Sequence, residues 1–253
     1  MKQRLLPLVI TQHVLCALAL ALSVGVAHAD MNFMSLGWNT MYTDTWASNQ
    51  LWWKQRQPSA ERSGSYSSPQ AQASPHSAPR GASAVALSTG QTFATKKGIS
   101  QLVAPVPAEN QPEAAKMFTT LILTFEKTIP RTYGIPANNL ASAYAAVLAG
   151  SYAAYTNRPF PENAVKPLFE QVQQGMLDNP QISRVSVDKK AAMYQVWVGA
   201  GMYLLGWQAQ LAKHPNPEEQ AKMQKAGADS LRAALAGTDP SRVRFTTRGM
   251  EVH

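Results

Sequence analysis

The chain has 253 residues, a formal net charge of +8 and a single cysteine, and this length suits one or two domains. The basic excess is spread evenly, with 6 basic against 4 acidic residues in 30–109 and 12 against 10 in 110–240. A nucleic-acid-binding face needs a concentrated basic stripe. We therefore expect no nucleic-acid partner.

The first 29 residues have the pattern of a secretory signal peptide. Lys2 and Arg4 precede an apolar run over 14–26, and residues 27–29 ("AHA") have the small-x-small form of a cleavage site. An uncleaved anchor helix would need a longer apolar run. We expect export to the periplasm or the medium, with no transmembrane span in the mature chain. Cys16 would leave with the peptide, so stability must come from a packed core rather than a disulfide.

An aromatic-rich segment follows over 30–57. Three interpretations stay open: a binding element for an envelope protein partner, an interfacial membrane helix, or a segment that folds back to complete a core. The side chains that would bind a partner are Trp38, Tyr42, Trp46, Trp52 and Trp53.

Residues 58–90 are dominated by small residues and proline. Of these 33 residues, 23 are Pro, Ser, Ala or Gly, so the stretch cannot bury enough surface to offset its ordering entropy. We interpret it as a flexible, disordered linker. The helical domain is then expected over 91–253.

Five amphipathic or apolar segments within 91–253 have helical periodicity. Pro130 should end the first of them, and Asn216, Pro217 and Glu219 form the N-terminal signature of the last. The predicted helices are 112–129, 136–157, 164–176, 187–213 and 217–236. We predict an all-α fold, a five-helix bundle. Two short alternating segments near Phe93 and Phe245 are predicted to pair as strands that clasp the bundle.

The most apolar stretch of the predicted domain is "VWVGAGMYLLGW" over 196–207. Its glycines lack both the third glycine of a dinucleotide fingerprint and the preceding strand, and the run is short for a membrane span. We interpret 187–213 as the buried central helix, covered on every side. Gly199, Gly201 and Gly206 would then allow close approach, for example against an alanine stripe over 141–149.

One catalytic motif needs consideration. Ser186 and Lys189 have the S-x-x-K spacing of serine acyl-enzymes, in which the lysine amine activates the hydroxyl. A serine hydrolase of envelope material is therefore the alternative function. No Lys-Ser/Thr-Gly strand follows, and a serine that caps a helix beside a solvated lysine fits equally. We therefore expect a non-enzymatic binding or structural protein of the cell envelope. We also expect no cofactor, and no metal because the few histidines lack ligand spacing.

The predicted domain also resembles a family of exported bacterial proteins of unknown function, over about residues 87–252. The resemblance rests on "YGIPANNLASAY" at a helix start and "RFTTRGMEV" at the end. It implies a helical fold and an exported location. It carries over no catalytic residues.

Overall fold

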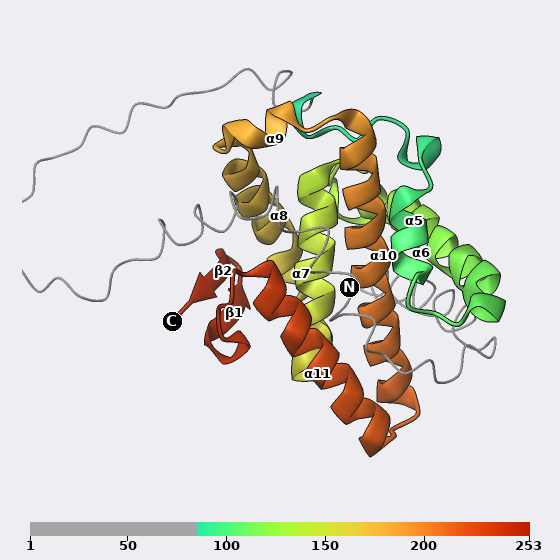
Figure 1. The fold of residues 1–253 in the computed structure, drawn as a ribbon. Coiled ribbons are helices and arrows are strands. Elements are labelled where there is room, and N and C mark those ends of the chain that lie inside the picture. The colour runs from blue at the N-terminus through green and yellow to red at the C-terminus, as the bar shows by residue number, and fades with distance from the viewer. Residues whose placement is uncertain (1–84) are drawn as a thin grey trace, which may run out of the picture.

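The computed structural model describes residues 85–253 and shows a bundle of α-helices with one small β-hairpin (Figure 1). The α-helices are α5 (Lys97–Val103), α6 (Gln111–Tyr133), α7 (Leu140–Thr156), α8 (Glu162–Leu177), α9 (Pro180–Arg184), α10 (Val187–Lys213) and α11 (Pro217–Ala234). The short 3-10 helices are η1 (Thr92–Ala94), η2 (Ala108–Asn110) and η3 (Pro240–Arg242), and the strands are β1 (Val243–Thr246) and β2 (Gly249–Val252). The all-α class is confirmed. The helix count exceeds five because the short α5 and α9 join the five predicted helices.

Side-chain caps fix the start of α11 at the predicted residue, Pro217, and move the start of α7 from the predicted residue 136 to Leu140. The Asn216 side chain accepts from the backbone N–H groups of Glu218 and Glu219 at the start of α11, and Asn139 accepts from Ala141 N at the start of α7. Such caps satisfy backbone donors that have no partner within the helix.

The predicted end of α6 at Pro130 is wrong. Pro130 lies inside the last turn of α6, which continues to Tyr133. Gly134 then ends the helix with a left-handed φ of 66° and donates its N–H to Pro130 O. A proline costs a helix one donor and crowds the preceding turn, and here the glycine cap ends the helix one turn later.

The central position of α10 is confirmed. Every residue from 190 to 202 is buried, and Figure 1 shows α10 running between α7 on one side and α5 with α6 on the other. Among the described helices, none combines the length and the apolarity that a membrane crossing needs.

The α7–α10 crossing depends on two glycines. A Cβ on Gly150 would lie 2.2 Å from the carbonyl oxygen of Gly201, and one on Gly201 would lie 2.4 Å from Ala146 O. The predicted close approach is therefore made by Gly201, but it meets Ala146 and Gly150 rather than the stripe of Ala141, Ala145 and Ala149. Gly199 instead faces Leu102 of α5.

The predicted strand clasp between the Phe93 and Phe245 segments is wrong. Phe93 lies in η1, and β1 pairs antiparallel with β2 in a register that places Phe245 opposite Met250. A two-residue turn joins β1 to β2, so this local pairing closes a far shorter loop than a pairing across the whole domain would.

The domain starts earlier than residue 91. Leu87 and Thr89 are fully buried, and Ser88 forms an isolated antiparallel bridge with Asn139. The last residues assigned to the linker therefore belong to the helical domain.

We expect Gly150→Ala to destabilise the domain by about 1–3 kcal/mol, the usual cost of overpacking a core. Without a clash, alanine would stabilise a helix by about 1 kcal/mol relative to glycine. A net loss of stability would therefore show that the added methyl group clashes at the α7–α10 crossing. Urea unfolding followed by circular dichroism measures the effect.

The matched control is Ala221→Ser, which adds one heavy atom at an exposed position of α11. This substitution should leave the urea concentration at the midpoint of unfolding nearly unchanged. A Gly150→Ala protein that is as stable as the wild type would show that α7 and α10 do not touch there.

Candidate functional site

The part of the domain richest in long-range polar contacts is the segment that crosses one end of the bundle, residues 85–96, which we call the strap. Figure 1 shows it as the blue-green chain that passes over the first turns of α10 before α5 begins. Its residues come from the end of the predicted linker and from the predicted Phe93 strand. It brings together side chains from α6, the α6–α7 loop and α10.

Two side chains of α10 hold the strap. Lys190 Nζ donates to Ala86 O over 2.7 Å. Gln195 Nε2 donates to the carbonyl oxygens of Thr92 and Thr95, over 2.7 and 2.6 Å, while its Oε1 accepts from Ile99 N over 3.1 Å. Gln195 is fully buried, so its amide replaces the backbone partners that the strap lacks.

A second tie runs through the hydroxyl of Thr92. Thr92 Oγ1 lies 2.5 Å from Glu126 Oε1 on α6 and 2.7 Å from Asn138 Oδ1 in the α6–α7 loop. A hydroxyl has one hydrogen, so Thr92 can donate to only one of these oxygens. With donation to the carboxylate, the amide of Asn138 serves as the donor through its nitrogen, since the two ends of an amide are assigned from their surroundings.

Tyr194 of α10 joins this cluster. Burial raises the pKa of its phenol far above the ordinary value, and the neighbouring Glu126 carboxylate raises it further. The hydroxyl therefore keeps its proton, and it accepts from the backbone N–H of Asn138 over 3.4 Å. The tyrosine is therefore a structural hydrogen-bonding group and does not act as an acid or base at neutral pH.

Lys190 is a buried cation that has no carboxylate partner among the described residues. It is 5% exposed, and its one hydrogen bond in that part of the chain is to Ala86 O. Burial lowers its pKa, because removal from water disfavours the charged form. Its position in the first turns of α10 also puts it near the positive end of the helix dipole.

Two exposed apolar side chains lie in the strap, and a third lies next to it on α10. Val85 is 76% exposed, Val187 56% and Phe93 40%. Val187 lies over the strap, because a Cβ on Gly90 would be 3.0 Å from its Cγ1. The fourth large exposed hydrophobic side chain of the described residues, Leu123, lies on α6.

The structure gives Ser186 the role of a helix cap. Its Oγ accepts from Lys189 N over 3.3 Å, and both residues are exposed. In the part of the chain that the structure describes, no hydrogen bond joins the hydroxyl to the Lys189 ammonium. The pair therefore lacks the contact by which a lysine base activates a serine.

The other predicted site residues cannot be placed. Trp38, Tyr42, Trp46, Trp52 and Trp53 lie outside the described residues. Within 85–253, no group of three His, Cys, Asp or Glu side chains is arranged to hold a metal ion.

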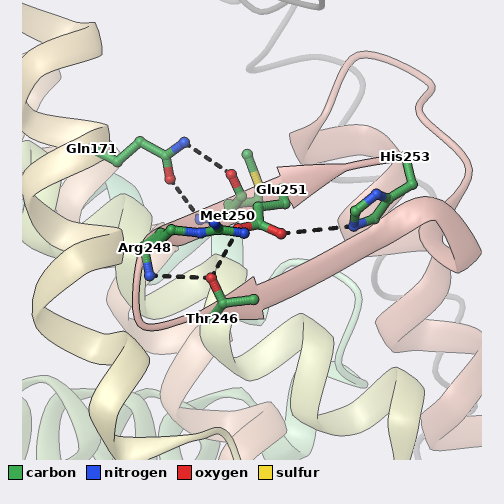
Figure 2. Close-up of polar contacts among 6 residues, drawn as sticks. All are labelled: Gln171, Thr246, Arg248, Met250, Glu251 and His253. Atoms are coloured by element: carbon green, nitrogen blue, oxygen red, sulfur yellow. Dashed lines mark hydrogen bonds and ion pairs between the residues drawn. The ribbon is translucent and has the colours of Figure 1, made fainter.

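The C-terminal hairpin is held by one glutamine of α8. Figure 2 shows the Gln171 amide reaching the backbone of Met250: its Nε2 donates to Met250 O over 3.0 Å, and its Oε1 accepts from Met250 N over 2.7 Å. Gly249 leaves room for this contact, since a Cβ there would lie 2.6 Å from Gln171 Oε1.

An ion-pair cluster closes the turn of the same hairpin. Glu251 Oε1 accepts from Arg248 Nε over 3.0 Å and from Thr246 Oγ1 over 3.1 Å, and Glu251 Oε2 lies 3.8 Å from His253 Nε2 (Figure 2). The hydrogen bonds from Arg248 and then from Thr246 lower the pKa of Glu251. This cluster stabilises the turn at the surface.

The residues that hold the strap were not among the predicted site residues. Gln195 interrupts the apolar centre of α10, and Lys190 occupies a helix position that is otherwise apolar. A buried polar side chain requires a partner. These two interruptions were therefore the available signal, but they do not say which segment is bound.

The fold and these contacts define a helical-bundle domain closed at one end by a strap. The chain belongs to DUF6683, a family of unknown function, which matches residues 10–253. The match extends beyond the segment 87–252 on which the resemblance rests. No curated protein and no solved structure matches the chain significantly.

Two buried threonines of the strap should respond in opposite ways to loss of the hydroxyl. Thr92→Val removes the donor to Glu126 and should destabilise the domain by about 1–3 kcal/mol. The Thr89 hydroxyl is buried without a hydrogen-bond partner in the described part of the chain, so Thr89→Val should be neutral or slightly stabilising. Urea unfolding of both variants tests this, and equal losses would contradict the proposed role of Thr92.

The hairpin should loosen in acid. Because the folded pKa of Glu251 is depressed, its contribution is complete above the ordinary value of 4.5 and is lost as the pH falls through the lower folded value. An NMR titration should show hairpin amide shifts that follow Glu251. Arg248→Met should return its pKa toward 4.5, whereas Glu170→Gln on the exposed face of α8 should not. A Glu251 pKa unmoved by Arg248→Met would contradict the pairing.

Proposed function

We propose that this protein is exported and acts in the bacterial cell envelope as a non-enzymatic binding or structural protein. In this proposal the helical domain is a rigid carrier, and the aromatic segment 30–57 is the binding element. Residues 1–29 would direct export and be removed. The product would reside in the periplasm or outside the cell.

The observation that carries the proposal is the position of the exposed apolar side chains. Of the four in the described residues, Val85 and Phe93 lie in the strap and Val187 lies next to it. Single exposed hydrophobic residues are common on any protein, whereas several gathered at one end indicate an interaction surface. Residue 85 is also where segment 30–57 and its linker join the domain. A partner held by the aromatic segment would therefore meet this end first.

The polar groups of the described domain also favour binding over catalysis. Gln195, Glu126 and Thr92 each use their polar atoms to hold the strap. Ser186 caps a helix. These contacts give the groups structural roles, so the proposal assigns no reaction to the domain.

Deletion of 30–57 should abolish capture of envelope components by the tagged protein and leave thermal stability unchanged. Aromatic side chains at interfaces carry much of the binding free energy. The double substitution Trp52→Ala and Trp53→Ala should reduce capture at least tenfold, since each anchor contributes about 2 kcal/mol or more. Capture is measured by quantitative mass spectrometry of envelope fractions.

A second comparison of variants tests the exposed apolar side chains of the domain. Val85→Ser with Val187→Ser should weaken capture, whereas Leu123→Ser, an equally exposed apolar position on α6, should not. Unchanged capture with a lowered melting temperature after the 30–57 deletion would show that the aromatic residues complete the core. The proposal that segment 30–57 is the binding element would then be wrong.

A further inference from the structure

The strap is attached in a different way from the helices. Its backbone forms one isolated bridge, between Ser88 and Asn139, with a supporting bond from Thr89 N to Asn138 O of 3.0 Å. Its other long-range hydrogen bonds come from the side chains of Lys190, Gln195 and Thr92. Leu87 is its fully buried apolar anchor.

Polar groups with unused bonding capacity lie in and under the strap. The Thr89 hydroxyl is fully buried and makes no hydrogen bond within residues 85–253. The Lys190 ammonium has three donors and bonds only to Ala86 O among the described residues. Both groups would gain water on exposure, and a buried polar group without its full partners is costly. The free energy of uncovering them is therefore smaller than the buried apolar area alone would give.

The helices beneath the strap are joined independently of it. Gly98 of α5 packs against α10, where an added Cβ would lie 2.4 Å from Ala192 O. The α7–α10 crossing at Gly150 and Gly201 lies further along the bundle. Loss of the strap contacts removes none of these close approaches. The last two residues of the strap, Thr95 and Lys96, lie outside any helix and connect directly to α5.

We propose that the strap, residues 85–96, opens as a local unit around a hinge at Thr95–Lys96 while the helical bundle stays folded. Opening exposes the Leu87 side chain and the surface it covers, together with the side chains of Lys190, Gln195 and Glu126. Local opening of this kind has a free energy below that of global unfolding. The inference concerns the helical domain alone and does not depend on whether segment 30–57 binds a partner.

Thiol labelling measures the opening directly. Leu87→Cys and Leu148→Cys are each made in the full chain carrying Cys16→Ser, so that each protein has one thiol at a fully buried leucine position. We expect the thiol at 87 to react with maleimide at least tenfold faster than the thiol at 148, with little dependence on urea below the unfolding transition. Equal rates with the same urea dependence would overturn the proposal.

The two buried glutamines of α10 give a matched pair of variants that tests the hydrogen bonds holding the strap. Gln195→Met removes three hydrogen bonds to the strap and α5, and should speed labelling at 87 by about tenfold or more, because the closed strap loses these partners. Gln208→Met, on the same helix and also buried, should not. Equal acceleration of labelling by both variants would mean that α10 as a whole had been weakened. That result would overturn the role of Gln195 in holding the strap.

Hydrogen exchange in the unsubstituted protein removes any effect of the introduced cysteines. The amide of Thr89 should exchange with a lower opening free energy than the amides of Ala146 and Val147 at the α7–α10 crossing. Exchange of all three only through global unfolding would overturn the proposal.

Discussion

The backbone contact between Gly150 of α7 and Gly201 of α10 is the constraint on which the rest of the domain depends. Because both residues at the crossing are glycines, the two helices come closer than any larger residue permits. Both helices are buried on nearly all sides. Their other faces must be covered, so α5, α6, α8 and α11 surround the pair. The apolar character of α10 follows from its position in the bundle, and a membrane location is not needed to explain it.

Burial on every side also determines how the strap is held. The strap covers the first turns of α10 beside α5, and part of its backbone lies outside helices and strands, where N–H and carbonyl groups need other partners. Gln195 and Lys190 supply those partners from within the helix. These few side chains are the contacts through which α10 holds this segment.

Much of the bundle could be predicted from the sequence, because helix periodicity and caps are local signals. The cap at Asn216 and the span of α10 are examples. The strap contacts could not be predicted, because Thr92 reaches Glu126 and Gln195 reaches Thr92 across 34 and 103 positions of the chain. The segment around Phe93 alternates like a strand, but alternation does not supply a neighbouring strand, and side chains of α10 bind its backbone instead.

The single side chain of Gln171 has a consequence for association between molecules. A two-stranded sheet has two open edges, and an open edge can template pairing with another chain. The amide of Gln171 occupies both the N–H and the carbonyl of Met250, the outward-facing pair in the middle of β2. One edge of the hairpin is thus closed by a side chain that imitates a neighbouring strand. The hairpin is thereby protected from stacking into a longer sheet on that side.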